Sequence, residues 1–182
     1  VLHRNSGQME SFNQLNSQLV NENVYAILPD KEGSILLGTL SALVSFNPEK
    51  RSFTTIDKEK DGTPFTSQRI TILFRDSHKR LWIGGEEGIS VFQQEGIEIE
   101  KAPILPESSV TKMFTNCIYE AANGIIWVGT REGFYCFNEK EKKIKRYTTA
   151  NGLPNNVVYG ILEDTFGRLW VSTNRGISCF NP

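Results

Sequence analysis

The sequence is poor in cysteine and histidine, and it contains no long apolar run. Its 182 residues include three cysteines and two histidines. Three cysteines do not make a disulfide framework, and none of these side chains has the convergent spacing of a metal site, so we expect neither a metal nor a cofactor. No apolar run reaches the roughly 18 residues of a membrane-spanning helix, so we expect no membrane contact from this segment.

A strong net charge is also missing. The 20 Lys and Arg residues are balanced by 21 Asp and Glu residues, which gives a net charge of −1 and a pI near 6.2. Without a basic field, nucleic acid and anionic lipid are not expected partners. Sustained helical periodicity with caps is absent as well, so we expect the chain to be almost free of helix.

One short phrase returns four times along the chain. In each copy an apolar run carries an aromatic residue or a leucine, followed two positions later by a small residue. The copies are SILLGT at 34–39, RLWIGG at 80–85, IIWVGT at 125–130 and RLWVST at 168–173. The positions of Leu36, Trp82, Trp127 and Trp170 are 46, 45 and 43 residues apart. A period in the forties, made of short strands and turns, is typical of β-propeller blades.

The last copy shows the strand pattern of one blade most clearly. A buried strand A, a short apolar strand B and an alternating strand C are predicted at 156–164, 169–172 and 177–180. In the third copy a polar strand D follows at 143–148, and its charge suits the exposed edge of a sheet. The same four strands fit around 23–56, 69–99 and 116–147.

The chain is therefore predicted to be an all-β segment of a β-propeller, built from four-stranded antiparallel blades and holding about four blade equivalents. We expect the end of one blade in 1–20, blades in 21–65, 66–112 and 113–150, and the first three strands of a blade in 151–182. Strands C and D of the first, partial blade are predicted at 1–4 and 9–12. The alternatives are a closed ring of four blades and an open arc of a larger ring. We favour the arc, whose uncovered apolar faces have to meet a neighbour in a longer protein or in a dimer.

The tryptophans and the small residues that follow them are expected to pack between blades. Trp82, Trp127 and Trp170 hold one strand position in successive copies, which favours a seam between sheets over a sugar-stacking role. A small residue in a tightly packed sheet lets a neighbouring backbone approach closely. In the four copies this residue is Gly38, Gly84, Gly129 and Ser172.

Carboxylates recur at the turn between strands A and B. Asp30, Asp76 and Asp164 occupy this turn, and Ala121 replaces them in the third copy. Equivalent residues of stacked sheets lie roughly 10 Å apart, so these carboxylates are not expected to converge on one bond. We predict a turn-forming role for them, no catalytic residue, and no enzymatic activity for this segment. A glycosidase or lyase, the alternative, would need convergent acidic, Tyr or His groups near the axis.

The repeat resembles the two-component regulator propeller repeat. The pattern is Asn-x-Val-x-x-Ile-x-x-Asp, then Gly-x-Leu-Trp-Val-Gly-Thr, Gly-Ile/Leu and Phe-Asn, and it is matched best at 151–182. The segments 76–92 and 118–138 match it too. The first copy departs at Leu36 and Ala42 but keeps Phe-Asn-Pro at 46–48.

The resemblance implies the periplasmic sensor region of a Bacteroides-type hybrid two-component protein, a sensor histidine kinase and response regulator in one chain. It implies a periplasmic portion of an inner-membrane protein that responds to an oligosaccharide and controls polysaccharide-utilisation genes. The partners it implies are the neighbouring blades or propeller of the parent chain and a second copy of the parent in a homodimer. A propeller that binds another protein and no small ligand is the alternative function.

A ligand is expected at the rim where strand A begins and the turns between strands B and C emerge. Loops on a rigid scaffold are where binding usually occurs, and amide and guanidinium groups suit sugar hydroxyls. The candidate ligand-binding residues are Asn23, Arg69, Asn116, Arg131, Asn156 and Arg175. The same rim gathers Asn21, Glu86, Glu87, Glu132, Asn155 and Asn174. The alternative for each residue is that its side chain only satisfies a turn or a strand start.

Overall fold

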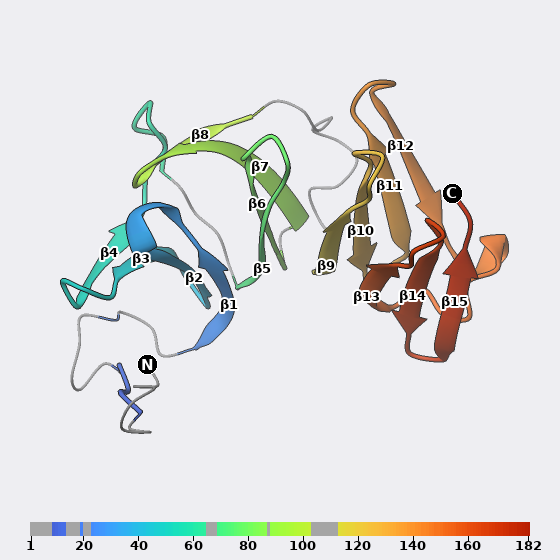
Figure 1. Ribbon diagram of the computed structural model, residues 1–182, viewed down its shortest axis with the longest axis horizontal. Coiled ribbons are helices and arrows are strands. Elements are labelled where there is room, and N and C mark those ends of the chain that lie inside the picture. Colours follow the sequence, from blue (N-terminus) through green and yellow to red (C-terminus); the bar gives the residue numbers. More distant parts are fainter. Residues whose placement is uncertain (1–8, 14–18, 20–22, 65–68, 87, 103–112) are drawn as a thin grey trace.

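The computed structural model describes residues 9–13, 19, 23–64, 69–86, 88–102 and 113–182. Its strands form four separate sheets that stand side by side as an arc, in the order of the chain (Figure 1). The predicted strand at 1–4 lies outside the described residues, and the predicted strand at 9–12 is not formed, because only Met9 takes part in an isolated β-bridge there. The arrangement confirms the prediction of consecutive propeller blades.

Every sheet is antiparallel and is made of strands that follow one another in the sequence. The first sheet contains β1 (Val24–Pro29), β2 (Ile35–Thr39), β3 (Leu43–Asn47) and β4 (Ser52–Ile56). The second contains β5 (Ile70–Arg75), β6 (Leu81–Gly85), β7 (Gly88–Glu95) and β8 (Glu98–Lys101). The third contains β9 (Thr115–Glu120), β10 (Ile126–Thr130), β11 (Phe134–Asn138) and β12 (Lys143–Tyr147). The fourth contains β13 (Val158–Glu163), β14 (Leu169–Thr173) and β15 (Gly176–Phe180).

Helical structure among the described residues is limited to two 3₁₀ turns, η1 (Lys31–Gly33) and η2 (Thr149–Asn151). The all-β prediction is therefore confirmed. Strand β13 begins at Val158, later than the sequence pattern indicates. Asn155 and Asn156 accept hydrogen bonds through their side chains from the N–H groups of Val157 and Thr149, at 2.8 Å each, so they shape the loop instead of extending the strand.

The second sheet departs from the repeat. Its third strand, β7, is longer than the equivalent strands, and the connection after β4 folds back through a bridge between Lys58 and Pro64. The Lys60 N–H then donates to the Ile99 carbonyl at 2.8 Å, which adds a hydrogen bond at the edge of β8.

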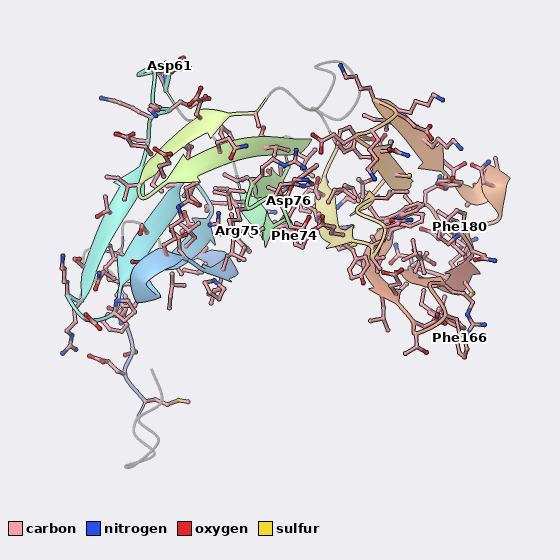
Figure 2. The ribbon with its side chains drawn as sticks, turned by 45° about the horizontal axis from the view of Figure 1, so that its top comes forward. Asp61, Phe74, Arg75, Asp76, Phe166 and Phe180 are labelled. Atoms are coloured by element: carbon pink, nitrogen blue, oxygen red, sulfur yellow. The ribbon has the colours of Figure 1, made fainter. Side chains whose placement is uncertain are left out.

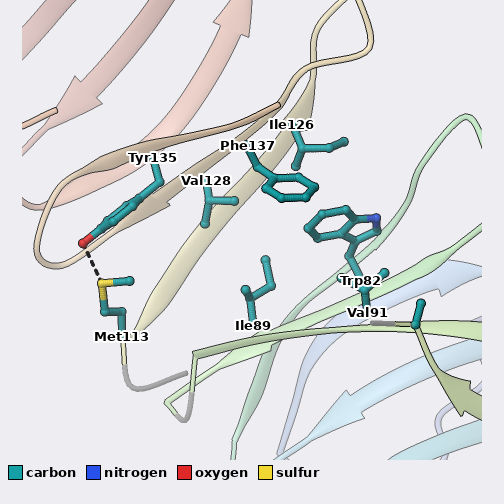
Figure 3. Packing of buried hydrophobic residues seen from close by; sticks show 9 residues of the cluster. Trp82, Ile89, Val91, Met113, Ile126, Val128, Tyr135 and Phe137 are labelled. Carbon is teal, nitrogen blue, oxygen red and sulfur yellow. Dashed lines mark hydrogen bonds between the residues drawn. The ribbon is translucent and has the colours of Figure 1, made fainter. Parts of the chain in front are cut away.

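The inner strands β1, β5, β9 and β13 contact one another in succession, so each sheet packs its face on the next. Trp82 is fully buried between the second and third sheets, against Ile126, Val128 and Phe137 (Figure 3). Trp127 is buried in the same way between the third and fourth sheets, beside Leu169. The predicted seam position is confirmed for both tryptophans. Trp170 is only half-buried, because no sheet in the described residues follows β13–β15.

The small residue after the tryptophan makes room for the next sheet. A Cβ added at Gly84 would lie 2.9 Å from Thr115 Cγ2, and one at Gly129 would lie 2.6 Å from Val158 Cγ1. Thr115 and Val158 are the first residues of β9 and β13. Each glycine therefore faces the start of the following inner strand, as predicted. Ser172 has this position in the last copy and is exposed.

We define the outer face of the last sheet by four residues, Leu162, Trp170, Ile177 and Cys179. Strand pairing aligns Leu162 with Trp170 and Trp170 with Cys179, so these side chains share one side. Leu162 is 64% exposed and Ile177 is 63% exposed. The equivalent residues of the second sheet, Phe74, Trp82, Ile89 and Val91, pack in the seam with the third sheet. The last sheet thus exposes the positions that the second sheet buries against its neighbour.

Residues before β1 cover part of the opposite end of the arc. Leu19 is buried there, and the Phe12 ring centroid lies 4.9 Å from that of Phe46 and 5.9 Å from that of Phe53. Phe46 and Phe53 are themselves stacked at 4.5 Å. The first sheet therefore buries its far face against residues from the predicted partial blade at 1–20.

The glycine positions give a first prediction. Gly129→Ala is expected to destabilise the chain by about 1–3 kcal/mol, because the added methyl group overlaps Val158. Ser172→Ala is the matched control at the exposed equivalent position, where a change within about 0.5 kcal/mol is expected. Urea unfolding followed by tryptophan fluorescence measures both. Equal midpoints for the two variants would show that the seam tolerates a side chain.

Candidate functional site

The turn after strand A holds a carboxylate that binds an indole and a guanidinium group. Asp76 Oδ2 accepts from Trp82 Nε1 at 2.7 Å and from Arg80 Nε at 2.6 Å, while Asp76 Oδ1 accepts from the Arg80 N–H at 2.8 Å. Asp76 and Trp82 lie in the seam between the second and third sheets, and Figure 2 marks Asp76 there. We call this set the Asp–Arg–Trp lock.

The last sheet repeats the lock. Asp164 Oδ2 accepts from Trp170 Nε1 at 2.9 Å and from Arg168 Nε at 2.7 Å. These bonds, that of the Trp170 indole first, hold the pKa of Asp164 well below its usual value. Asp76 and Asp164 thus serve the turn, as predicted, and they also bind the tryptophan indole, which the sequence pattern did not indicate.

The first sheet uses its aspartate differently, because Leu36 replaces the tryptophan. Asp30 accepts from Arg75 Nη2 at 3.0 Å and from Gln94 Nε2 at 2.9 Å, and both donors belong to the second sheet. The equivalents of Arg75 in the next two sheets, Glu120 and Glu163, also reach back across a seam. The Glu120 carboxylate accepts from the Ser77 N–H at 2.7 Å and from the Ser77 hydroxyl at 2.6 Å.

We number the seams in chain order, so that the third seam lies between the third and fourth sheets. Glu163 makes the corresponding contacts there. It accepts from the Ala122 N–H at 2.9 Å and from the Tyr119 hydroxyl at 3.2 Å. Burial first, and then the Glu163 charge, raises the pKa of Tyr119. The rim that holds the A–B turns is therefore built from polar groups that join neighbouring sheets.

The opposite rim holds the ligand-binding residues predicted from the sequence. Each inner strand carries a β-bulge after its first residue there, at Tyr25, Thr71, Asn116 and Tyr159. Asn116 Nδ2 donates to the Val158 carbonyl at 2.8 Å, and Thr71 Oγ1 donates to the Thr115 carbonyl at 2.9 Å. Asn116 therefore joins two sheets.

Two predicted residues, Asn116 and Asn156, are engaged in bonds of the fold itself. Asn156 Oδ1 accepts the Thr149 N–H at the start of η2. These bonds correspond to the alternative in which the amides satisfy strand and turn backbone. Asn23 is exposed just before β1, and Arg175 is exposed in the turn between β14 and β15. The structure does not bring Asn156 into a common cluster with the arginines.

Arg69 and Arg131 do lie in clusters at this rim. Arg69 Nη1 pairs with Glu86 Oε1 at 2.9 Å, and its guanidinium carbon lies 5.5 Å from the centroid of the Tyr25 ring. Arg69 Nε is buried and has no hydrogen-bond partner among the described residues. The Arg131 guanidinium lies 3.8 Å from the centroid of the Phe114 ring.

Three aromatic residues at this rim, Tyr25, Phe114 and Tyr159, were not among the predicted binding residues. Tyr25 is 44% exposed and Tyr159 is 53% exposed, and the Tyr159 hydroxyl donates to Asn174 Oδ1 at 2.7 Å. Strand A is predicted to be a buried strand, so exposed rings were not expected on it, whereas Tyr25 and Tyr159 are the bulged residues of β1 and β13 and lie exposed at the rim. We call Tyr25, Arg69, Glu86, Phe114, Arg131, Tyr159, Asn174 and Arg175 the aromatic rim.

The aromatic rim offers ring faces, guanidinium groups and amides without a nucleophile and base in contact. Such a surface suits a ligand with hydroxyl or carboxylate groups. In the described ranges no three His, Cys, Asp or Glu side chains converge as a metal site requires. The described residues also form no helix with the length and hydropathy that a bilayer crossing needs.

Two repeats of the chain are similar to repeats in known proteins. Residues 108–132 and 152–175 match the family model of the two component regulator propeller. The chain is 29% identical over 161 residues to Histidine kinase P4 of Formosa agariphila, and the match covers 84% of this chain and 12% of that protein. Two of the repeats thus match the two-component regulator propeller repeat.

Solved structures show the same fold. The extracellular domain of a hybrid two-component system from B. thetaiotaomicron superposes with a TM-score of 0.77 at 22% identity, covering 97% of this chain and 24% of that one. A second such domain from B. thetaiotaomicron gives a TM-score of 0.73 at 23% identity, over 96% of this chain and 24% of that one. This chain spans about a quarter of each of these structures.

The lock gives a second prediction. Asp76→Ala is expected to cost about 3–5 kcal/mol, because it leaves the buried Arg80 guanidinium and Trp82 indole without their shared acceptor. Asp164→Ala removes the equivalent carboxylate at a half-exposed site. Water can replace that carboxylate there, so a smaller loss of stability is expected. Chemical denaturation of both variants measures the difference. A larger loss for Asp164→Ala would contradict the role assigned to burial.

Proposed function

We propose that this chain is part of the ligand-sensing propeller of a two-component sensor, and that its ligand contacts the aromatic rim. The similarity to Histidine kinase P4 and to two-component regulator propeller repeats supports the first part. The kinase activity of a parent protein is part of the proposal, since this chain spans 12% of that relative. This segment itself senses and does not catalyse.

The proposed ligand is an oligosaccharide. The observation that carries this is the aromatic rim, where Tyr25 and Tyr159 expose their rings beside Arg69 and Asn174. Aromatic faces pack on the apolar faces of sugar rings, while guanidinium and amide groups bind hydroxyl and carboxylate oxygens. The parent protein would then use this signal to control polysaccharide-utilisation genes, with the propeller on the periplasmic side of the inner membrane.

We further propose that the chain is an arc of a larger ring. The outer face of the last sheet exposes, at equivalent positions, the side chains that the second sheet buries together with Trp82 in its seam with the third sheet. A following sheet, or the neighbouring propeller in a parent homodimer, would cover it. Ligand binding can shift such packing only if it favours one arrangement of the parent over another.

The same exposed face supports the second candidate function, a propeller that binds a protein. Phe166 is 80% exposed at the tip of the A–B turn beside this face (Figure 2). A partner of that kind would bind without any small ligand. Substitutions at the aromatic rim should weaken binding only under the first function, and substitutions beside the outer face only under the second.

Calorimetric titration of the parent ectodomain with a panel of oligosaccharides tests the proposal. One glycan is expected to give heat, and Tyr159→Ala or Arg131→Ala is expected to weaken its binding at least about tenfold, or ~1.4 kcal/mol. Lys140→Ala, in the turn between β11 and β12 at the opposite rim, is the matched control and should leave binding unchanged. Circular dichroism confirms that each variant folds. Absence of heat with every glycan, together with a protein complex that Phe166→Ala disrupts, would favour the second function.

A further inference from the structure

The second sheet departs from the repeat at three places, and residues from all three line one hollow. Strand β7 has 8 residues, where β3, β11 and β15 have 5 each. The connection after β4 lies along β8, since the Lys60 N–H donates to the Ile99 carbonyl at 2.8 Å (Figure 1). Lys79 stands where the other A–B turns have a glycine. Residues 93–95 of β7, Lys60 and Lys79 line a hollow of about 480 Å³, a volume typical of small-molecule sites.

The A–B turn does not need the Lys79 side chain. The φ angle of Lys79 is 64°, in the left-handed region, and the equivalent glycines Gly33, Gly124 and Gly167 have φ angles of 76°, 79° and 75°. Glycine adopts this conformation without steric cost, whereas a residue with a Cβ does not. The turn therefore gains nothing from lysine, and its ammonium group is placed at the hollow.

One side of the hollow is basic and comes from the A–B turns of the first two sheets. Lys31 lines it from the first turn, and His78 and Lys79 line it from the second. Arg75 holds the two turns together, because its Nη2 donates to Asp30 Oδ1 at 3.0 Å and its Nη1 donates to the Lys79 carbonyl at 3.2 Å. The two lysines therefore start from backbone segments that one guanidinium group fixes side by side.

The other side of the hollow is acidic and comes from β8, with Glu98 and Glu100. Among the described residues that line the hollow, the only ion pair joins Lys60 to Glu95 at 3.9 Å, and both of its side chains are exposed. The sheet order is β5-β6-β7-β8, so β8 lies two strands away from β6, which begins at the A–B turn. Neighbouring strands lie about 4.8 Å apart, so the backbones of the two sides are separated by roughly 10 Å.

We propose that this hollow binds a free peptide of about three residues. A ligand that contacts both sides has to carry an anionic group and a cationic group about 10 Å apart. An extended chain spans about 3.3–3.6 Å per residue, so the terminal carboxylate and ammonium groups of a tripeptide have this separation. The carboxylate binds Lys31 and Lys79, and the ammonium group binds Glu98 and Glu100. The site is separate from the aromatic rim and does not depend on the function proposed for it.

Calorimetric titration of the parent ectodomain with trialanine tests the proposal, and saturable heat is expected. N-acetyl-trialanine lacks the ammonium group and trialanine amide lacks the carboxylate. Each loses one of the two charge contacts, so each is expected to bind about fivefold more weakly than trialanine. Free alanine carries both charges but cannot span the hollow, and it is expected to bind more weakly than trialanine too.

Variants of the two sides complete the test. Lys79→Gly and Glu100→Gln are each expected to weaken trialanine binding about fivefold. Lys79→Gly gives the turn the residue of its equivalents, so the fold should survive. Lys142→Gly is the matched control, because Lys142 is exposed with a φ of 51° in the turn between β11 and β12, away from the hollow. Trialanine without saturable heat, equal binding of the acetylated or amidated peptide, or an equal loss for Lys142→Gly and Lys79→Gly would overturn the proposal.

Discussion

The structure depends on the burial of each sheet against its neighbour. A three- or four-stranded sheet cannot remove both of its faces from water alone, so its stability comes from the seams. Trp82 and Trp127 are the largest fully buried side chains of the described residues and lie at two seams, and a glycine two positions later lets the next inner strand approach. The same rule accounts for the exposed outer face of β13–β15, since nothing in the described residues packs on it.

The two rims differ in how many of their polar and aromatic side chains stay free to contact a ligand. At the rim of the A–B turns, Glu120 and Glu163 bind backbone N–H groups of the preceding sheet, and Asp30 binds side chains of the following one. These bonds fix the angle between sheets and use the carboxylates. At the opposite rim, exposed rings and arginines remain at the surface around the start of the inner strands. The division explains why the oligosaccharide is proposed at the aromatic rim and a structural role is assigned to these carboxylates at the other.

The third seam shows how a repeat can change without losing its fold. Ala121 and Ile125 keep the backbone turn, because the Ala121 N–H still donates to the Ile125 carbonyl at 2.9 Å. Stacking on Phe134 and an edge contact with Phe180 hold the Trp127 ring. The polar part of the lock is therefore separable from its apolar part, since the Trp127 indole nitrogen has no partner among the described residues while that of Trp82 donates to Asp76.

The repeat period, the strand types, the seam tryptophans, the small residues and the turn aspartates could all be predicted from the sequence, because each is a local pattern that four copies make visible. The exposure of Tyr25 and Tyr159 at the rim could not, since the inner strands were predicted to be buried and a β-bulge leaves no periodic signal in the sequence. The engagement of Asn116 by the Val158 carbonyl and the unpaired nitrogen of Trp127 were equally invisible. The first contact joins residues 42 positions apart, and the second feature depends on which atoms surround the indole once it is buried. Only the packing of one sheet on the next decides both.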